Sequence, residues 1–257
     1  MKKKKLLTAV MSLALVGAVA VGGTLAYLSD ASGKVTNTFT MGAGYETVDD
    51  HTGLWLDETK KKDGTRYPTE IGATAADRIE GDEDGTNGVQ YQELLPGDNM
   101  VKDPTFHMTE GSVKSRVVMK VTGLDKLNGN HFTISYNQIS YNEDGSIYAT
   151  ALNVDTRGET WRKIANTDGS EDNLEATLDG YYVYNTPVDA SAGAVDLEPL
   201  FRYITFDKNV DTVAFNEIKT ALGNDTTIKV GGVATQWDNT TVDDTLEFAK
   251  DSLGTMQ

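Results

Sequence analysis

Alternation of apolar and polar residues with a period of two predicts β-strands along most of the chain. In the strand predicted at 34–41, the residues that share one side are Val35, Asn37, Phe39 and Met41. Further strands are predicted at 112–122, 132–137, 147–152, 159–164, 181–184 and 200–206, and a hairpin at 226–237 around Gly231 and Gly232. Nine or more short strands with few helices favour an all-β, antiparallel, jelly-roll-like sandwich.

A helical pattern of apolar residues occurs near the end of the chain. Thr241 suits an N-cap, and Asp244 three residues later completes a capping box. The apolar residues that follow at helical spacing are Val242, Leu246, Ala249 and Leu253. Gly254 is placed to end this helix, and a second short helix is predicted at 213–222.

Residues 45–90 break the alternation, because Asp, Glu, Lys and Gly dominate them. Trp55 and Tyr67 are the scattered aromatic anchors of this stretch. The composition predicts a long, irregular acidic insertion in the sandwich that is ordered in part.

An acidic loop in this insertion invites comparison with a calcium-binding loop. Asp82, Asp84 and Thr86 fall at positions 1, 3 and 5, and Glu93 falls at position 12. The glycine required at position 6 is Asn87, and no helices are predicted on either side, so the pattern does not support an EF-hand. Asp82, Asp84 and Glu93 stay as weak candidates for Ca²⁺, with a solvated loop as the simpler interpretation, and no other cofactor is predicted.

The beginning of the chain has the three parts of a secretory signal peptide. Four lysines occupy 2–5, an apolar stretch without charge occupies 6–21, and small residues follow at 22–26. This apolar stretch is shorter than the ~20 residues that a membrane-spanning helix needs. We therefore expect a signal helix at 1–27 that holds the chain at the membrane only until it is cleaved.

Cleavage is expected after Ala26 or after Tyr27, so that the exported chain begins near Leu28. Residues 28–257 are then expected to form a single secreted domain. The segment 1–27 holds four of the 23 basic residues and none of the 39 acidic ones, which leaves 19 against 39 and a net charge of −20. A surface this acidic repels phosphate backbones and excludes nucleic acid as a partner.

Catalytic motifs are not found in the sequence. The chain has no cysteine, which removes thiol catalysis and fits an exported bacterial protein better than a disulfide-bonded animal one. Its three histidines, His51, His107 and His131, are far apart and form no compact ligand pattern, although a zinc site assembled from distant strands stays open. No catalytic residue is predicted.

The segment GGTLAYLSD at 22–30 resembles the signal-peptide junction of the TasA/camelysin family of Gram-positive secreted proteins. The segment NTFTMG at 37–42 is similar to the N-x-F-x-x-G strand of that family. The resemblance implies cleavage by a signal peptidase of the SipW type and a jelly-roll domain in the extracellular biofilm matrix or at the cell surface. It also implies that the protein is a structural subunit, since some members build fibres.

Fibre assembly has a plausible physical route in this sequence. The strand at 34–41 follows the cleavage site and can add to the open sheet edge of a second copy or of another matrix or surface protein. Val35, Phe39 and Met41 would then fill pockets in that neighbour. The alternatives are a secreted metallopeptidase, which the camelysin branch implies, and a carbohydrate- or ligand-binding module that uses Trp55, Trp161 and Trp237.

Overall fold

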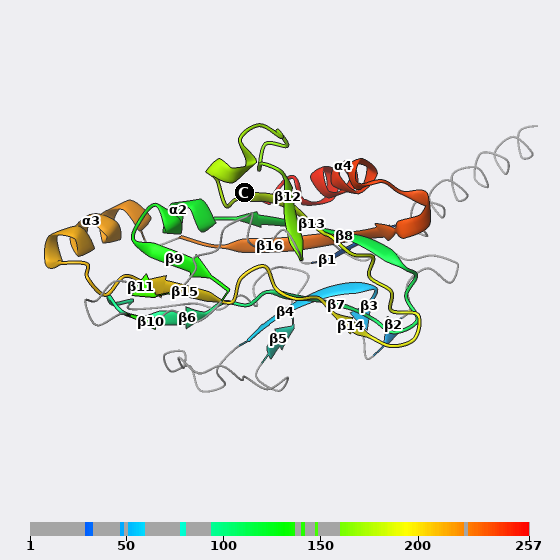
Figure 1. Ribbon diagram of the computed structural model, residues 1–257, viewed down its shortest axis with the longest axis horizontal. Helices are drawn as coiled ribbons and strands as arrows, with labels where there is room; N and C mark the ends of the chain where they lie inside the picture. Colours follow the sequence, from blue (N-terminus) through cyan, green and yellow to red (C-terminus); the bar gives the residue numbers. More distant parts are fainter. Residues whose placement is uncertain are drawn as a thin grey trace, which may run out of the picture.

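The computed structural model describes residues 29–32, 47–48, 51–59, 78–80, 94–136, 140–141, 147–148, 160–223 and 226–256. These residues form a mainly β structure with a few short helices, in which every strand pair is antiparallel (Figure 1). The prediction of an all-β, antiparallel fold is therefore confirmed. Most strands expected from the alternation are present; the strand expected at 34–41 and the signal helix lie outside the described residues.

A five-stranded sheet forms one layer of the molecule. Its strands in spatial order are β1 (Ser29–Ser32), β16 (Lys229–Gln236), β8 (Ser115–Thr122), β13 (Gly180–Tyr184) and β12 (Trp161–Ala165). The longest pairing joins β16 to β8 over eight residues, from Lys229↔Thr122 to Gln236↔Ser115. These two strands form the middle of the layer.

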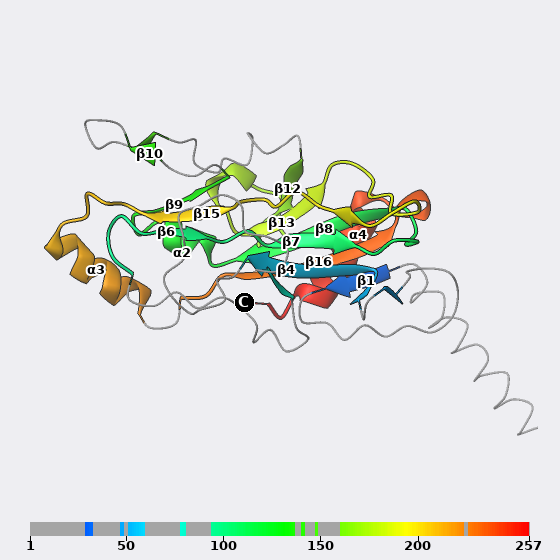
Figure 2. The ribbon, with the colours of Figure 1, turned by 90° about the horizontal axis from the view of Figure 1, so that it is seen from below.

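Two smaller sheets lie side by side in the second layer (Figures 1 and 2). One is four-stranded, in the order β14 (Val195–Asp196), β7 (Thr105–Met108), β4 (Leu54–Thr59) and β5 (Arg78–Glu80). The other is three-stranded, in the order β6 (Asn99–Val101), β15 (Tyr203–Phe206) and β9 (Phe132–Ser135). Two short strand pairs complete the set: β2 (Thr47–Val48) with β3 (His51–Thr52), and β10 (Ser140–Tyr141) with β11 (Ile147–Tyr148).

The main hydrophobic core fills the space between the two layers. From β8, Val117, Met119 and Val121 point into it, as the alternation predicted. The four-stranded sheet contributes apolar residues from β4 and β7, namely Leu54, Leu56, Phe106 and Met108. Apolar burial of this kind, at about 25 cal/mol per Å² removed from water, is what joins the two layers.

A second, smaller core lies on the outer face of the five-stranded sheet under helix α4 (Val242–Leu253). Thr241 caps this helix and forms the expected capping box with Asp244, so that prediction is confirmed. Leu246, Ala249 and Leu253 are buried against the sheet. The other helices among the described residues are α2 (Leu124–Asn128), α3 (Thr212–Leu222), and the 3₁₀ turns η3 (Leu174–Ala176) and η4 (Trp237–Asn239). Helix α3 confirms the prediction at 213–222.

The predicted hairpin at 226–237 is wrong, because β16 runs straight through Gly231 and Gly232. Gly232 serves close packing instead of a turn. A Cβ atom on Gly232 would lie 2.4 Å from an edge carbon of the Phe106 ring, which is buried between the layers. Glycine is therefore the residue that lets the phenylalanine of the second layer approach this backbone.

Within the stretch 45–90, predicted as an insertion that is ordered in part, Leu54–Thr59 form strand β4 of the second layer. The acidic composition hid a short alternating pattern. Leu54 and Leu56 face the core, while Trp55 and Asp57 lie on the opposite face of the strand. The chain therefore places polar residues on an outer sheet face, where the candidate site is found.

Candidate functional site

The residues that the sequence predicted for cleavage, assembly and calcium binding all lie outside the described residues. This applies to the cleavage positions Ala26, Tyr27 and Leu28, to the assembly strand Val35, Asn37, Phe39 and Met41, and to the calcium candidates Asp82, Asp84 and Glu93. Strand β1, however, begins directly after the expected cleavage site, at Ser29. The structure therefore describes the segment where a new N-terminus would meet the sheet.

Strand β1 forms the edge of the five-stranded sheet (Figure 2). Its four residues pair with β16 in antiparallel register, from Ser29↔Thr235 to Ser32↔Gly232. Within the described part of the chain, β1 has a strand partner on one side only. A short strand at a sheet edge is a structure that can pair with a second chain.

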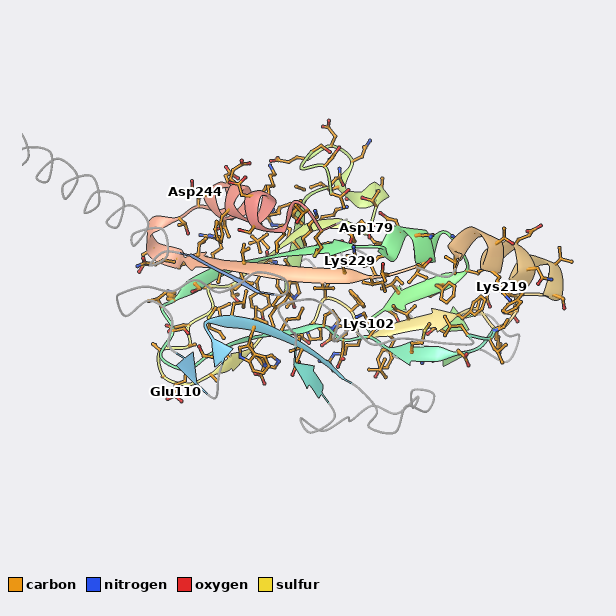
Figure 3. All side chains as sticks on the ribbon, turned by 180° about the vertical axis from the view of Figure 1, so that it is seen from behind. Lys102, Glu110, Asp179, Lys219, Lys229 and Asp244 are labelled. Carbon is orange, nitrogen blue, oxygen red and sulfur yellow. The ribbon has the colours of Figure 1, made fainter. Side chains whose placement is uncertain are left out.

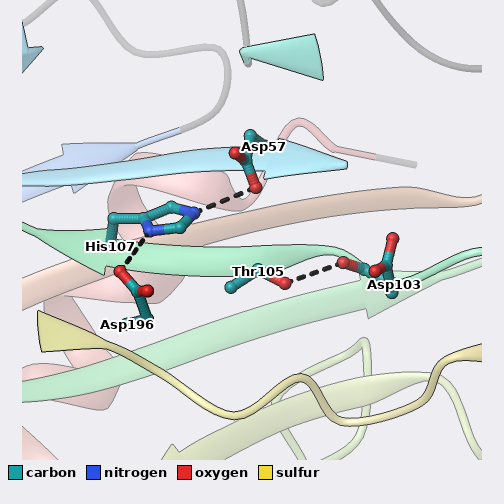
Figure 4. A network of polar contacts seen from close by, with 5 residues as sticks. All are labelled: Asp57, Asp103, Thr105, His107 and Asp196. Carbon is teal, nitrogen blue, oxygen red and sulfur yellow. Dashed lines mark hydrogen bonds and ion pairs between the residues drawn. The ribbon is translucent and has the colours of Figure 1, made fainter. Parts of the chain in front are cut away.

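A polar cluster occupies the outer face of the four-stranded sheet (Figure 4). His107 of β7 lies between two carboxylates from neighbouring strands, Asp57 of β4 and Asp196 of β14. The His107 Nε2 atom is 2.9 Å from Asp57 Oδ1, and the Nδ1 atom is 2.7 Å from Asp196 Oδ1. The Trp55 ring stacks on the imidazole, with centroids 4.1 Å apart and planes inclined by 20°. We call the three hydrogen-bonded residues Asp57, His107 and Asp196 the Asp57–His107–Asp196 clasp.

The protonation state of His107 follows from this geometry. Burial lowers the pKa of His107, but the hydrogen bonds and charges of Asp57 and then Asp196 outweigh burial, so the pKa is raised above its ordinary 6.5. A carboxylate accepts and does not donate, so both ring nitrogens must carry a proton to satisfy both contacts. The imidazolium has no free lone pair, so in this arrangement it can neither act as a general base nor bind a metal.

His131, the other histidine whose side chain is described, is not part of this cluster. His131 is exposed and has a left-handed backbone with φ of 62°. Across the described ranges, no group of three His, Cys, Asp or Glu side chains has a geometry that could hold a metal ion. The metallopeptidase alternative therefore stays a prediction from resemblance.

The tryptophans proposed for sugar stacking have different environments. Trp161 is buried in the main core with 1% of its surface exposed, so the prediction that it stacks on a ligand is wrong. Trp237 is half-buried, and the guanidinium of Arg116 lies 3.9 Å from its ring centroid. Trp55 is stacked on His107. Each of these rings already has a partner in the fold.

A second carboxylate pair, Asp125 and Asp179, joins the start of α2 to the start of β13. The Asp179 carboxylate accepts from the backbone N–H groups of Gly123, Leu124 and Asp125, at 2.9, 2.7 and 3.3 Å. The Asp125 carboxylate accepts in return from the N–H groups of Leu178 and Asp179, at 2.6 and 3.2 Å.

Burial raises the pKa of Asp179 and the nearby charge of Asp125 adds to this, against the opposing effect of the backbone donors. The oxygens of both carboxylates are occupied by amides, which assigns the pair a structural role. Figure 3 shows Asp179 on the same side of the five-stranded sheet as Asp244 of α4.

Neither the clasp nor the Asp125–Asp179 pair was predicted from the sequence, and the reason is the same for both. The clasp joins residues 50 and 89 positions apart, and the reciprocal pair joins segments more than 50 positions apart. One signal was available: Asp57 lies two residues after Trp55 and His107 lies two after Thr105, so each strand places polar residues on one face.

Among the described residues, no helix has the length and apolar character needed to cross a membrane. Comparison with protein-family models, with curated proteins and with solved structures gave no match for the chain.

Proposed function

We propose that the chain is an exported structural subunit of a Gram-positive extracellular matrix or cell surface, which self-associates through its N-terminal segment. A signal peptidase of the SipW type would release it from the membrane after Ala26 or Tyr27. The observation that carries the proposal is the position of β1, which begins at Ser29 and forms the edge of the five-stranded sheet. The partner is a second copy or another matrix or surface protein.

Exchange of this strand between copies is energetically reasonable. Pairing of β1 with β16 involves four residues, and each backbone hydrogen bond contributes only about 0.5–1.5 kcal/mol net. The same bonds form again when the strand of a neighbour takes the place of β1. Val35, Phe39 and Met41 would add side-chain contacts to the neighbour. Self-association is then favourable when the free energy gained from these side-chain contacts exceeds the free energy needed to release the N-terminal segment from its own chain.

The proposed architecture is a jelly-roll-like sandwich formed by residues 28–257 as a single domain. The two β layers around a common core support this architecture. In such a fold the polymer contact lies at a sheet edge, and the core residues are left unchanged by assembly.

The test compares a chain that begins at Leu28 with a chain that lacks residues 28–41. Electron microscopy and sedimentation over a range of concentrations should show fibres from the first chain only, while circular dichroism shows that both are folded. A point variant, Phe39→Asp, should weaken assembly, and Val213→Asp on the exposed face of α3 serves as its surface control. Fibres from the truncated chain, or none from the folded complete chain at any concentration, would contradict the proposal. Zinc analysis of the same samples tests the metallopeptidase alternative.

A further inference from the structure

We propose that the Asp57–His107–Asp196 clasp is a proton-dependent fastener of the edge strand β14, which holds the strand when His107 is protonated and loosens it when His107 is neutral. This role is independent of the proposed function. It rests on the two contacts of the imidazole, at 2.7 and 2.9 Å, to carboxylates on two different strands.

Loss of the proton breaks one of these two contacts. A neutral imidazole has one N–H and one lone pair, so one carboxylate would lose its donor and face a lone pair. Asp57 is buried, so loss of the imidazole donor costs more there than at a carboxylate that water can reach. The side chain of Asp196 is 76% exposed, so water can replace the imidazole there. The remaining proton therefore stays on Nε2, and the contact to Asp196 is the one that opens.

The position of β14 makes this contact important for the strand. Strand β14 has two residues, lies at the edge of the four-stranded sheet, and pairs only with β7 among the described strands. The Leu197 amide next to it donates to the Phe106 carbonyl at 2.7 Å. With so few backbone bonds, one charge-assisted hydrogen bond is a large part of the local stability.

The charges that contact His107 come from the strands on either side of β7. Asp57 faces it from β4 and Asp196 faces it from β14. On β5, the titratable residue Glu80 pairs through its backbone with Asp57. The pKa of His107 is raised above 6.5, so its contribution to stability is complete below pH 6.5 and is lost as the pH rises through the pKa of the folded state.

Nuclear magnetic resonance of the full chain, produced with ¹⁵N-labelled histidine, tests the protonation state directly. The chain has three histidines, and His107→Gln assigns the signal of His107. We expect both ring nitrogens of His107 to be protonated at pH 6.5, with a titration midpoint above 6.5. A neutral His107 at pH 6.5, or a midpoint at or below 6.5, would overturn the proposal.

Amide hydrogen exchange tests the effect on the strand. Corrected for the intrinsic pH dependence, protection of the Leu197 amide should fall about fivefold as His107 loses its proton, as expected for one largely exposed charge-assisted hydrogen bond. The Thr109 amide, which donates to Gly53 on the β4 side, should not change.

Asp196→Asn and His107→Gln should remove this pH dependence, while the control His131→Asn keeps it, since asparagine accepts the left-handed backbone. Because Asp196 is exposed, the Asp196→Asn variant should fold even if His107→Gln does not. If the Leu197 amide is equally protected below and above the pH at which His107 titrates, the proposal that His107 protonation holds β14 is wrong.

Discussion

The two outer faces of the sandwich each hold a buried cation, in opposite electrostatic settings. On the five-stranded sheet, the Lys120 Nζ atom donates to the carbonyls of Leu253 and Gly254 at the end of α4, at 3.1 and 3.4 Å. On the four-stranded sheet, the imidazole of His107 lies between two carboxylates. Lys120 is bound by neutral dipoles, whereas His107 is bound by full negative charges.

The pKa directions follow this difference and not the depth of burial. Burial lowers the pKa of Lys120, and no counter-ion among the described residues opposes it. Burial also lowers the pKa of His107, but Asp57 and Asp196 reverse the direction. Lys163 is intermediate: burial lowers its pKa, and the charges of Asp125 and Asp179 oppose this without reversing it. Carboxylates in direct contact therefore decide the direction in which the pKa of a buried cation shifts in this fold.

The largest expected effect tests whether α4 is an integral cover of the five-stranded sheet. Leu246→Ala should lower the free energy of unfolding by about 2–4 kcal/mol, because it leaves a cavity between the helix and the sheet. Val213→Ala on exposed α3 is the matched control and should change it by less than about 0.5 kcal/mol. Urea unfolding measures both. Equal effects of the two substitutions would show that α4 does not stabilise this face.

The next largest expected effect is a difference in stability between substitutions of the two carboxylates of the clasp. At a pH below 6.5, Asp57→Asn should cost about 1–3 kcal/mol, because it removes a buried counter-ion of the imidazolium. Asp196→Asn should cost less than about 1 kcal/mol, since its side chain is largely exposed. Urea unfolding at a fixed pH compares them. A larger cost for Asp196→Asn would mean that exposure does not control the strength of the contact.

A third substitution changes the contact between the layers without touching either outer face. Gly232→Ala should cost about 1–3 kcal/mol, because the new methyl group overlaps the Phe106 ring. Gly193→Ala is the control, since a Cβ atom there meets nothing within 4 Å. Thermal unfolding measures the loss, and the pH dependence of both outer faces should be unchanged. If Gly232→Ala is as stable as Gly193→Ala, the close approach of the layers does not require glycine.

Gly232 also shows which parts of the fold the sequence could predict. The alternation in 112–122 and the capping box at Thr241 depend on neighbours within a few residues, so local patterns identified both. A pair of glycines is equally suited to a turn and to a tight contact. Only Phe106, more than 120 positions away, decides between them. Long-range packing is therefore what the local pattern lacked.

The candidate site was harder to predict than the fold. His107 looks like an ordinary strand residue until β4 and β14 bring Asp57 and Asp196 to its two nitrogens. With 39 acidic residues, no pairing of carboxylates with a histidine stands out in the sequence. The acidic stretch also concealed β4, which supplies both Asp57 and Trp55. The site is thus a product of sheet register.

The smallest expected effect concerns Lys120, for which the described part of the chain supplies no counter-ion. Lys120→Met should change the free energy of unfolding at pH 7 by less than about 1 kcal/mol, because the lost hydrogen bonds to two carbonyls are offset by the removal of a buried charge. In the wild type, the lowered pKa means that the unfolded state binds more protons, so stability rises with pH between the folded pKa of Lys120 and 10.5. Urea unfolding across this window should show the rise in the wild type and a smaller rise in Lys120→Met. A loss of several kcal/mol at pH 7 would instead mean that the dipole of α4 supports Lys120 as well as the two carboxylates support His107.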